Sequence, residues 1–178
     1  MSSKRGPWTI LKSKHIYKNP WMDVIEDSVI RPDGKDGIFG IVNIKSGVTI
    51  LPIDNEGNIF LIKQYRYTLK KKTIEAISGG IEKKENILKA AKRELKEETG
   101  IEAKEWINFG KINSLTTIVN SPNYLFLAKD LTFSKSNPEG TENIKIIKVS
   151  LKQAIDWIMK GLITSSVTST ILFKLKEL

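Results

Sequence analysis

Apolar residues along this chain recur mostly with the spacing of β-strands. The segments WTILKSKHIY and DVIEDSVI, within residues 8–29, are predicted to be two short strands, and the second alternates apolar and polar positions. The tripeptide Asn55-Glu56-Gly57 lies between two further strand-like segments and predicts a hairpin there. The strands expected beyond residue 30 are 38–44, 47–53, 58–67, 73–77, 106–113, 124–128 and 144–149.

Residues 84–98 have the spacing of an amphipathic helix. At 3.6 residues per turn, the apolar side chains fall in a stripe about 100° wide, as expected for a surface that faces a core. Gly100 is expected to end this helix as a C-terminal cap. Two more helices are predicted, at 151–159 and 166–175. Strands mixed with a few helices predict an α+β layered domain.

The charged side chains of the predicted helix are sorted by sign. Glu94, Glu97 and Glu98 gather at one edge of the apolar stripe, and the lysines lie beyond the other edge. Carboxylates on a rigid element suit a hard divalent cation such as Mg²⁺. The alternative is a solvated face whose Glu–Lys pairs only support the helix.

Composition narrows the class of protein. The chain has 178 residues, 40% of them hydrophobic, which suits one soluble domain with a sizeable core. It has no cysteine, which excludes disulfides, a thiol nucleophile and cysteine-ligated zinc. The start MSSKRGPWTI lacks the apolar core of a signal peptide, and no run reaches the length of a membrane span. We therefore expect a cytoplasmic protein that does not enter a membrane.

The net charge of +9 raises the question of nucleic acid. The lysines are spread along the chain, with one dense cluster at Lys70, Lys71 and Lys72. A positive field would equally attract a small nucleotide that carries a diphosphate. We expect a small nucleotide, and not nucleic acid, to be the main substrate.

The segment GGIEKKENILKAAKRELKEETGI matches a much longer pattern. It resembles the Nudix box, G-x5-E-x7-R-E-U-x-E-E-x-G-U, where U is a bulky aliphatic residue. All nine specified positions are filled, by Gly79, Glu85, Arg93, Glu94, Leu95, Glu97, Glu98, Gly100 and Ile101. The resemblance implies a pyrophosphohydrolase with the Nudix fold, an α/β/α sandwich with a mixed central sheet and a small N-terminal antiparallel β extension.

The resemblance also implies a metal site. Glu94, Glu97 and Glu98 would be ligands of Mg²⁺, for which Mn²⁺ could substitute, and the backbone carbonyl of Ser78 would be a further ligand. Glu97 and Glu98 are accordingly expected to be essential for catalysis. Hydrolysis of a pyrophosphate needs such a metal because it neutralises the phosphate charge and lowers the pKa of bound water.

The remaining box residues are expected to be structural. Gly79 would let the backbone approach the helix closely, and Gly100 would end the helix. In the family the arginine holds two glutamates in place, which here implies contacts of Arg93 with Glu85 and Glu97. The four-residue spacing from Arg93 to Glu97 permits that contact.

Flanking residues resemble the ADP-ribose pyrophosphatase branch of the family. The resemblance rests on IFLIKQYRYTLKKKTIEAISGG and extends, more loosely, over most of the chain from residue 8 onward. Members of this branch are dimers that exchange N-terminal strands. We therefore expect residues 1–45 to form an N-terminal β extension that serves dimerisation, residues 46–178 to form the Nudix hydrolase domain, and the protein to be a homodimer.

The same resemblance implies substrate contacts. Arg66 and Glu75 precede the box and are expected to bind the substrate, and Trp8 and Trp21 are candidates for stacking on its base. Both tryptophans could equally be ordinary core or interface aromatics.

A further acid in this branch comes from the loop before the strand predicted at 144–149. Glu142 is accordingly expected to be an additional metal ligand, and Glu139 is the candidate general base. The alternative for each is a solvated loop carboxylate.

The expected reaction is cleavage of a nucleoside diphosphate sugar to a nucleoside monophosphate and a sugar phosphate. The Ser-Pro-Gly loop typical of ADP-ribose hydrolases is absent, since this region reads NSLTTIVNSPNY, so GDP-mannose is an alternative to ADP-ribose. Two other hypotheses remain. One is a hydrolase of dinucleoside polyphosphates or capped RNA, and the other is a non-catalytic nucleotide-binding regulatory module.

Overall fold

The computed structural model describes residues 2–136 and 144–178. The chain forms two compact units: residues 1–46 with 113–122, and residues 47–112 with 123–178. Residues 113–122 thus join the first unit, although they lie inside the range predicted for the Nudix domain. No helix in the described part of the chain is long and apolar enough to span a membrane.

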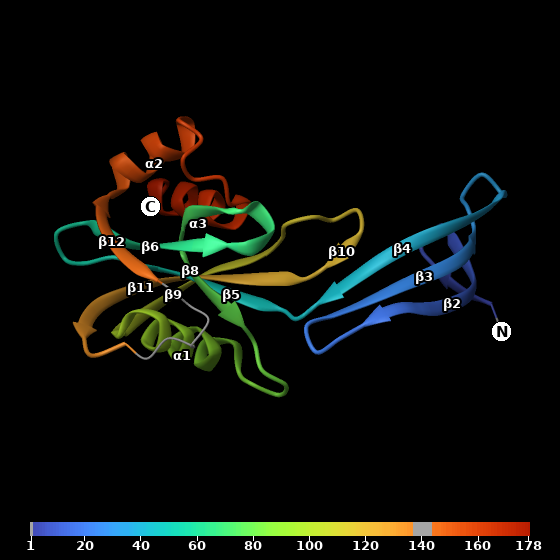
Figure 1. The fold of residues 1–178 in the computed structure, drawn as a ribbon, viewed down its shortest axis with the longest axis horizontal. Coiled ribbons are helices and arrows are strands. Elements are labelled where there is room, and N and C mark those ends of the chain that lie inside the picture. The colour runs from blue at the N-terminus through green and yellow to red at the C-terminus, as the bar shows by residue number, and fades with distance from the viewer. Residues whose placement is uncertain (1, 137–143) are drawn as a thin grey trace. The chain divides into compact units, whose positions relative to one another are not determined.

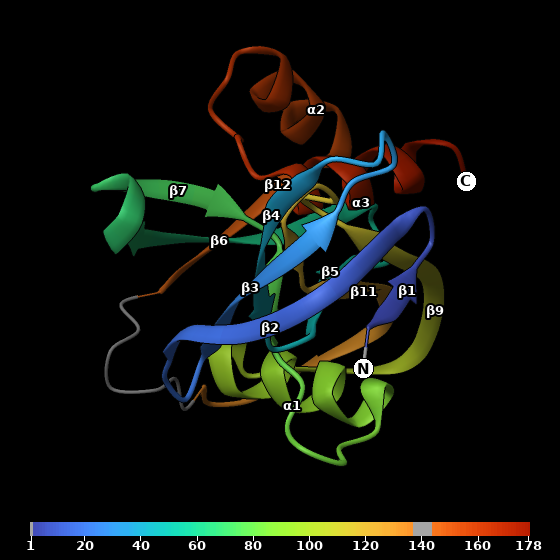
Figure 2. The same ribbon diagram turned by 90° about the vertical axis from the view of Figure 1, so that its right-hand side faces the viewer.

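The first unit is a five-stranded sheet with the order β1-β2-β3-β4-β10. Figure 2 labels β1 to β4 of this sheet, and Figure 1 labels β10. Neighbouring strands are antiparallel except β10, which runs parallel to β4. Of the residues described in this unit, only Asp27 and Val29 are buried, so the sheet has little core of its own. The strands are β1 Ser3–Arg5, β2 Trp8–Lys18, β3 Met22–Ile30, β4 Asp36–Ile44 and β10 Val119–Asn120.

The second unit contains two more sheets. In the first, with the order β8-β5-β11-β9, β11 is parallel and β8 antiparallel to β5. The second sheet, β12-β6-β7, is antiparallel. The strands are β5 Gly47–Pro52, β6 Asn58–Arg66, β7 Lys71–Glu75, β8 Ile77–Gly80, β9 Ile101–Asn113, β11 Pro122–Phe133 and β12 Lys145–Ser150. The helices are η1 Tyr67–Leu69, a 3₁₀ turn, and α1 Ile87–Thr99, α2 Leu151–Met159 and α3 Ser166–Lys176.

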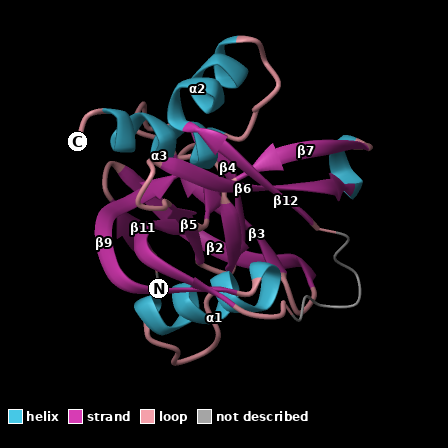
Figure 3. Ribbon diagram, turned by 90° about the vertical axis from the view of Figure 1, so that its left-hand side faces the viewer, coloured by secondary structure: helices cyan, strands magenta, loops and turns pink. Residues whose placement is uncertain are grey.

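Two apolar clusters lie on opposite faces of these strands, because successive strand residues point to opposite faces. On β6, Phe60 and Ile62 belong to the cluster that contains α1, whereas Ile59 and Leu61 belong to the cluster that contains α2 and α3. Figures 1 and 3 show α1 on one side of the strands and α2 and α3 on the other. This is the α/β/α arrangement expected from the sequence.

Several element boundaries differ from the sequence prediction. β9 begins at Ile101 and not at 106, and β11 covers Pro122–Phe133 and not only 124–128. Two further differences have a local cause. The helix predicted at 84–98 begins at Ile87. The side chain of Asn86 caps this end by accepting hydrogen bonds from two backbone N–H groups of the first helical turn. Lys84, which was expected to be helical, has a positive φ of 68°. The strand predicted at 73–77 is divided at Ala76, whose N–H donates to Thr168 Oγ1 at 3.0 Å. The chain passes there from one sheet to the other, and the glycines at 79 and 80 lie in β8.

Candidate functional site

Helix α1 is held against β8 and β5 by its apolar stripe. Ala90, Ala91 and Leu95 are fully buried and pack in one cluster with Val48 and Ile77. This packing brings Glu94 against Gly79 of β8, and it brings Arg93 within hydrogen-bond distance of Gly80 and Glu85. The polar residues of the box therefore occupy the boundary between the core and the solvent.

Gly100 ends α1 in the left-handed conformation, with φ of +70°. A Cβ at this position would also overlap the backbone carbonyl oxygen of Ser134. The carbonyl of Gly100 in turn accepts from the N–H of Ser134 at 2.7 Å and from its hydroxyl at 3.0 Å. Both the conformation and the close approach require glycine.

Gly79 is in direct contact with the carboxyl group of Glu94. A Cβ built on Gly79 would overlap all three atoms of that carboxyl group, so the absence of a side chain in β8 creates the space that Glu94 occupies. The φ of Gly79 is not in the left-handed region, so this glycine is needed for space and not for backbone conformation.

Arg93 is the centre of an ionic network. Its Nε and Nη2 donate to the two carboxylate oxygens of Glu85 at 2.9 and 3.0 Å, a bidentate arrangement. Its Nη1 donates to Glu94 at 2.8 Å and to Glu97 at 3.0 Å, and Nη2 also donates to the carbonyl of Gly80 at 2.9 Å. The hydrogen bond with Glu85, followed by those with Glu94 and Glu97, raises the pKa of Arg93 above its ordinary value despite partial burial. The arginine therefore remains charged.

The glutamates differ in exposure. The side chain of Glu94 is 14% exposed and that of Glu97 is 44% exposed, whereas Glu98 is buried on the helix face toward the core. Glu85, Glu94 and Glu97 all bind the one guanidinium of Arg93, and such an excess of oxygen donors and negative charge suits a hard divalent cation. Among the described residues, however, no three acidic or histidine side chains converge as a ready metal site. Glu94 and Glu97 are instead bridged by Arg93.

Ser78 lies in β8, one residue before Gly79, and pairs with Thr49 of β5. The two hydroxyl groups are 2.9 Å apart, and the Ser78 hydroxyl also lies 3.2 Å from the carbonyl oxygen of Ala76. Its side chain is therefore engaged in the sheet, which leaves its backbone carbonyl as the group of interest for a metal.

Arg66 and Glu75 are brought together by the β6–β7 pairing. Arg66 Nη2 donates to Glu75 at 2.6 Å and Nε donates at 3.2 Å, and the hydroxyl of Thr73 donates to the same carboxylate at 2.6 Å. Burial by itself would raise the pKa of Glu75, but these hydrogen bonds outweigh it and lower the pKa below its ordinary value. Arg66 and Glu75 therefore form a fixed ion pair within the second unit.

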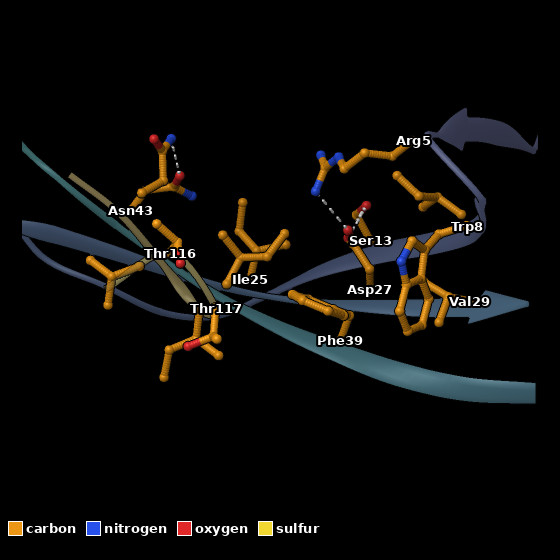
Figure 4. A pocket seen from close by; sticks show the side chains of 15 residues that line it. Arg5, Trp8, Ser13, Ile25, Asp27, Val29, Phe39, Asn43, Thr116 and Thr117 are labelled. Atoms are coloured by element: carbon orange, nitrogen blue, oxygen red, sulfur yellow. Dashed lines mark hydrogen bonds and ion pairs between the residues drawn. The ribbon is translucent and has the colours of Figure 1, made fainter. Parts of the chain in front are cut away.

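The two tryptophans lie at opposite ends of the β2–β3 hairpin. Trp8, at the start of β2, packs edge-on against Phe39 with a ring-centroid distance of 5.3 Å and lines a cavity of about 400 Å³ (Figure 4). Trp21, in the β2–β3 turn, is 72% exposed. The structure does not bring these two side chains together.

Sequence reasoning missed one buried acid. Asp27 lines the same cavity as Trp8, is 2% exposed, and accepts hydrogen bonds from Ser13 and Arg5 (Figure 4). The alternation in DVIEDSVI places Asp27 on the same face as Ile25 and Val29. A carboxylate on an apolar face is the feature of the sequence that could have predicted this buried acid. The other two predicted acids, Glu139 and Glu142, lie outside the described residues.

Comparison with known proteins agrees with this architecture. Residues 8–42 match the family described as the nucleoside diphosphate sugar hydrolase N-terminal domain, and residues 44–157 match the NUDIX domain. An ADP-ribose pyrophosphatase of Bacillus subtilis (strain 168) is 31% identical over 155 residues, which cover 83% of this chain and 80% of that protein. A methanol dehydrogenase activator of Bacillus methanolicus is 30% identical over 169 residues, which cover 89% and 86%.

A solved structure described as an ADP compounds hydrolase has the same fold. It superposes with a TM-score of 0.84 at 19% identity and covers 96% of this chain and 92% of that one. The NUDIX match spans more than half of the chain and includes α1 with its complete box. The α/β/α layers, the box geometry and these matches lead to one assignment: the chain belongs to the Nudix hydrolases, in the family of nucleoside diphosphate sugar and ADP-ribose hydrolases.

Proposed function

We propose that this protein is a metal-dependent pyrophosphohydrolase that cleaves a nucleoside diphosphate sugar, of the ADP-ribose or GDP-mannose type, to a nucleoside monophosphate and a sugar phosphate. The observation that carries this proposal is the box geometry, in which the Glu94 carboxyl group lies on Gly79 while Arg93 binds Glu85, Glu94 and Glu97. The substrate class is supported by the N-terminal match and by the name of the B. subtilis relative.

Nudix enzymes generally act with a divalent metal. In the proposed enzyme the ion is Mg²⁺, with Mn²⁺ as a substitute, and its ligands are the Ser78 carbonyl, Glu94, Glu97, Glu98 and, from the region outside the described residues, Glu142. A bound ion would neutralise the pyrophosphate charge and lower the pKa of its water ligand. The proposed ligands are all oxygen atoms, the donor type that this ion prefers, although no three acids of the described residues converge on one point.

The side chains themselves have distinct tasks in this proposal. Arg93, anchored by two hydrogen bonds to Glu85, holds Glu94 and Glu97 in fixed directions. Glu97 is exposed enough to meet a substrate or a water molecule. Glu139 is the proposed general base that accepts the proton of the attacking water, a role that requires it to come within hydrogen-bond distance.

Arg66 and Glu75 are the proposed substrate contacts of the second unit. Because Glu75 already holds the Arg66 guanidinium, the arginine is oriented before a phosphate or ribose arrives. Trp8 and Trp21 are proposed to stack on the base, and their separation in the hairpin means that they would serve different sites or different subunits.

We also propose that the protein is a cytoplasmic homodimer in which the N-terminal sheet, residues 1–45, provides the dimer contacts. The support is the small core of this sheet together with the large apolar side chains that it exposes, among them Ile16, Ile38 and Ile44. Light scattering of the full chain at several concentrations tests the dimer directly.

The experiment that tests the reaction is a phosphate-release assay with Mg²⁺ and a coupling phosphatase, on ADP-ribose, GDP-mannose, UDP-glucose, NADH and diadenosine polyphosphates. Turnover concentrated on one nucleoside diphosphate sugar supports the proposal and supplies the specificity. Turnover only of the diadenosine compounds, or of capped RNA added as a further substrate, would favour that alternative instead. If none of these substrates is hydrolysed with metal present, the proposal that the protein is a hydrolase of this class is contradicted.

The relative named as a methanol dehydrogenase activator favours a second candidate function, the activation of a partner dehydrogenase. A dehydrogenase assay with and without the chain tests it. If activation occurs, a Glu98→Gln variant separates the two candidates, because activation that survives the loss of hydrolysis would show a regulatory role independent of catalysis.

A further inference from the structure

The β6–β7 hairpin presents a basic and aromatic face that the proposed reaction does not use. Strand pairing places Lys63 between Ile74 on β7 and Lys145 on β12, and it places Tyr65 opposite Lys72. Directly paired residues share a face, and so do residues two apart on one strand. Lys63, Tyr65, Lys72 and Lys145 therefore lie on the same face, and all four are exposed.

The tip of the hairpin continues this surface. Tyr67, in the short helix η1, is 89% exposed, and Tyr65 before it is 54% exposed. Lys70 follows at the tip and is exposed. Lys71 is exposed too, but it pairs with Arg66 and so lies on the face of the Arg66–Glu75 pair. Figure 3 shows the helical turn at the end of the hairpin. We call this surface the basic hairpin, and it consists of Lys63, Tyr65, Tyr67, Lys70, Lys72 and Lys145.

The charge of the basic hairpin is not neutralised within the described part of the chain, where none of its four lysines forms an ion pair. The nearby acid of the hairpin, Glu75, is already bound by Arg66 and Thr73. Four uncompensated cations on this hairpin and the adjoining strand β12 attract a polyanion.

Protection of a sheet edge explains only part of this surface. β7 is the edge strand of its sheet, and lysines such as Lys71 and Lys72 discourage edge-to-edge pairing. That role does not require the exposed rings of Tyr65 and Tyr67. Lysines that follow a phosphate backbone beside aromatic rings that stack on bases are the combination used to bind single-stranded nucleic acid.

We propose that the basic hairpin binds single-stranded nucleic acid, with its lysines on the phosphates and its tyrosines stacked on unpaired bases. A duplex hides its bases and offers the tyrosines nothing to stack on. This binding goes beyond the proposed hydrolysis, because it requires neither the box nor a pyrophosphate. The opposite face of the same hairpin carries the Arg66–Glu75 pair.

The test is fluorescence anisotropy of a labelled 20-nucleotide oligouridylate with a 5′-hydroxyl end, titrated with the full chain in EDTA over a series of KCl concentrations. The probe has no pyrophosphate, so its binding is measured independently of hydrolysis. We expect log K to fall with log salt with a slope of about −0.7 for each phosphate neutralised, or about −2.8 if all four lysines take part. A duplex of equal length and anionic vesicles of phosphatidylserine and phosphatidylcholine are the competing probes.

Two variants assign the binding to the hairpin. A K63A/K72A double variant, which removes two lysines from the face of Tyr65, should make the salt slope shallower by about 1.4, the contribution of two phosphates. Tyr67→Ala removes a ring that is almost fully exposed, so the fold is not at risk, and it should weaken oligouridylate binding about tenfold. The control is K174A/K176A, which removes the same charge from exposed positions on α3.

Three results would overturn the proposal. They are no binding of the oligonucleotide at about 50 mM KCl, an equal effect of the hairpin and control lysine pairs, and binding of vesicles or duplex in preference to the single strand. All variants should hydrolyse the nucleotide-sugar substrate at the wild-type rate. A loss of oligonucleotide binding with intact hydrolysis therefore bears on the hairpin alone.

Discussion

Replacement of Gly79 by alanine is the sharpest test of the box geometry. The added methyl group would occupy the space now filled by the Glu94 carboxyl group, so this side chain must move away from β8. The backbone of Gly79 has no positive φ, and alanine can adopt it without strain. The substitution therefore perturbs one contact, the one between β8 and the glutamate.

The cost can be estimated from the structure. Insertion of a methyl group at a packed position destabilises by about 1–3 kcal/mol. The displaced Glu94 also weakens its 2.8 Å hydrogen bond with Arg93, and hydrogen bonds to charged groups contribute about 1.5–3 kcal/mol. Arg93 Nη1 keeps its contact with Glu97, so only part of that second amount is lost. We expect about 2–4 kcal/mol in total, or a decrease in Tm of roughly 5–15 °C for a chain of this size.

Catalysis should respond more strongly than stability. A displacement of about 1 Å in a catalytic group can cost about a hundredfold in rate, so kcat/KM of G79A should fall by about that factor on the substrate found in the panel. The matched control is Gly40→Ala, because Gly40 is also a strand glycine without positive φ and a Cβ there would meet nothing within 4 Å. Thermal unfolding by circular dichroism and steady-state kinetics are measured on both variants. If G79A has wild-type kcat/KM, the assignment of Glu94 to the metal site is refuted.

Three further predictions concern the same unit. Glu97→Gln and Glu98→Gln should each lower turnover by at least about a hundredfold, equivalent to about 2.7 kcal/mol, with unchanged circular dichroism; full activity in both would contradict the metal site. EDTA should abolish hydrolysis, and Mg²⁺ or Mn²⁺ should restore it. The Tm of the metal-free chain should stay within a few degrees of the Tm with metal, because Arg93 holds the glutamates without metal. Activity that persists in EDTA would refute metal dependence. Because folding lowers the pKa of Glu75, the ionised side chain stabilises the fold fully above its ordinary pKa of 4.5, and this stabilisation is lost as the pH falls through the lowered pKa. In urea unfolding from pH 3 to 7, the Glu75→Gln variant should therefore lose less unfolding free energy at acidic pH than the wild type. Equal pH profiles of the two proteins would contradict the ion pair.

The sequence was sufficient for features that depend on local periodicity. The stripe of α1 faces the core as its 3.6-residue spacing predicts, and Gly100 ends the helix as its position suggests. The start of the helix was placed three residues too early, because lysines and glutamates at 82–85 are compatible with a helix and only the Asn86 cap reveals the boundary. Asparagine before an apolar run is a signal that could have been used.

Contacts between strands could not be predicted from linear order. The lysine cluster at 70–72 has no aromatic residue within it, and Tyr65 becomes its neighbour only through the pairing of β6 with β7. The assignment of residues 113–122 to the first unit has the same origin, because it depends on the parallel pairing of β10 with β4. Such pairings join residues up to 92 positions apart, as for Asn58 and Ser150, and single-sequence patterns carry no information on them.

The spacing of the box follows from the reach of one side chain. Arg93 contacts residues 13 and 8 positions before it and 1 and 4 positions after it, so the segment before α1 and one face of α1 are fixed to the same guanidinium. The planar guanidinium of arginine has five N–H donors, so it can bind Glu85 with two parallel hydrogen bonds and still reach Glu94, Glu97 and a backbone carbonyl. Lysine, a point charge with three donors, could not hold these partners in fixed directions. The residues of the box are therefore coupled through Arg93, and a change in the length of the segment from Gly80 to Arg93 would displace the glutamates even if every box residue were retained.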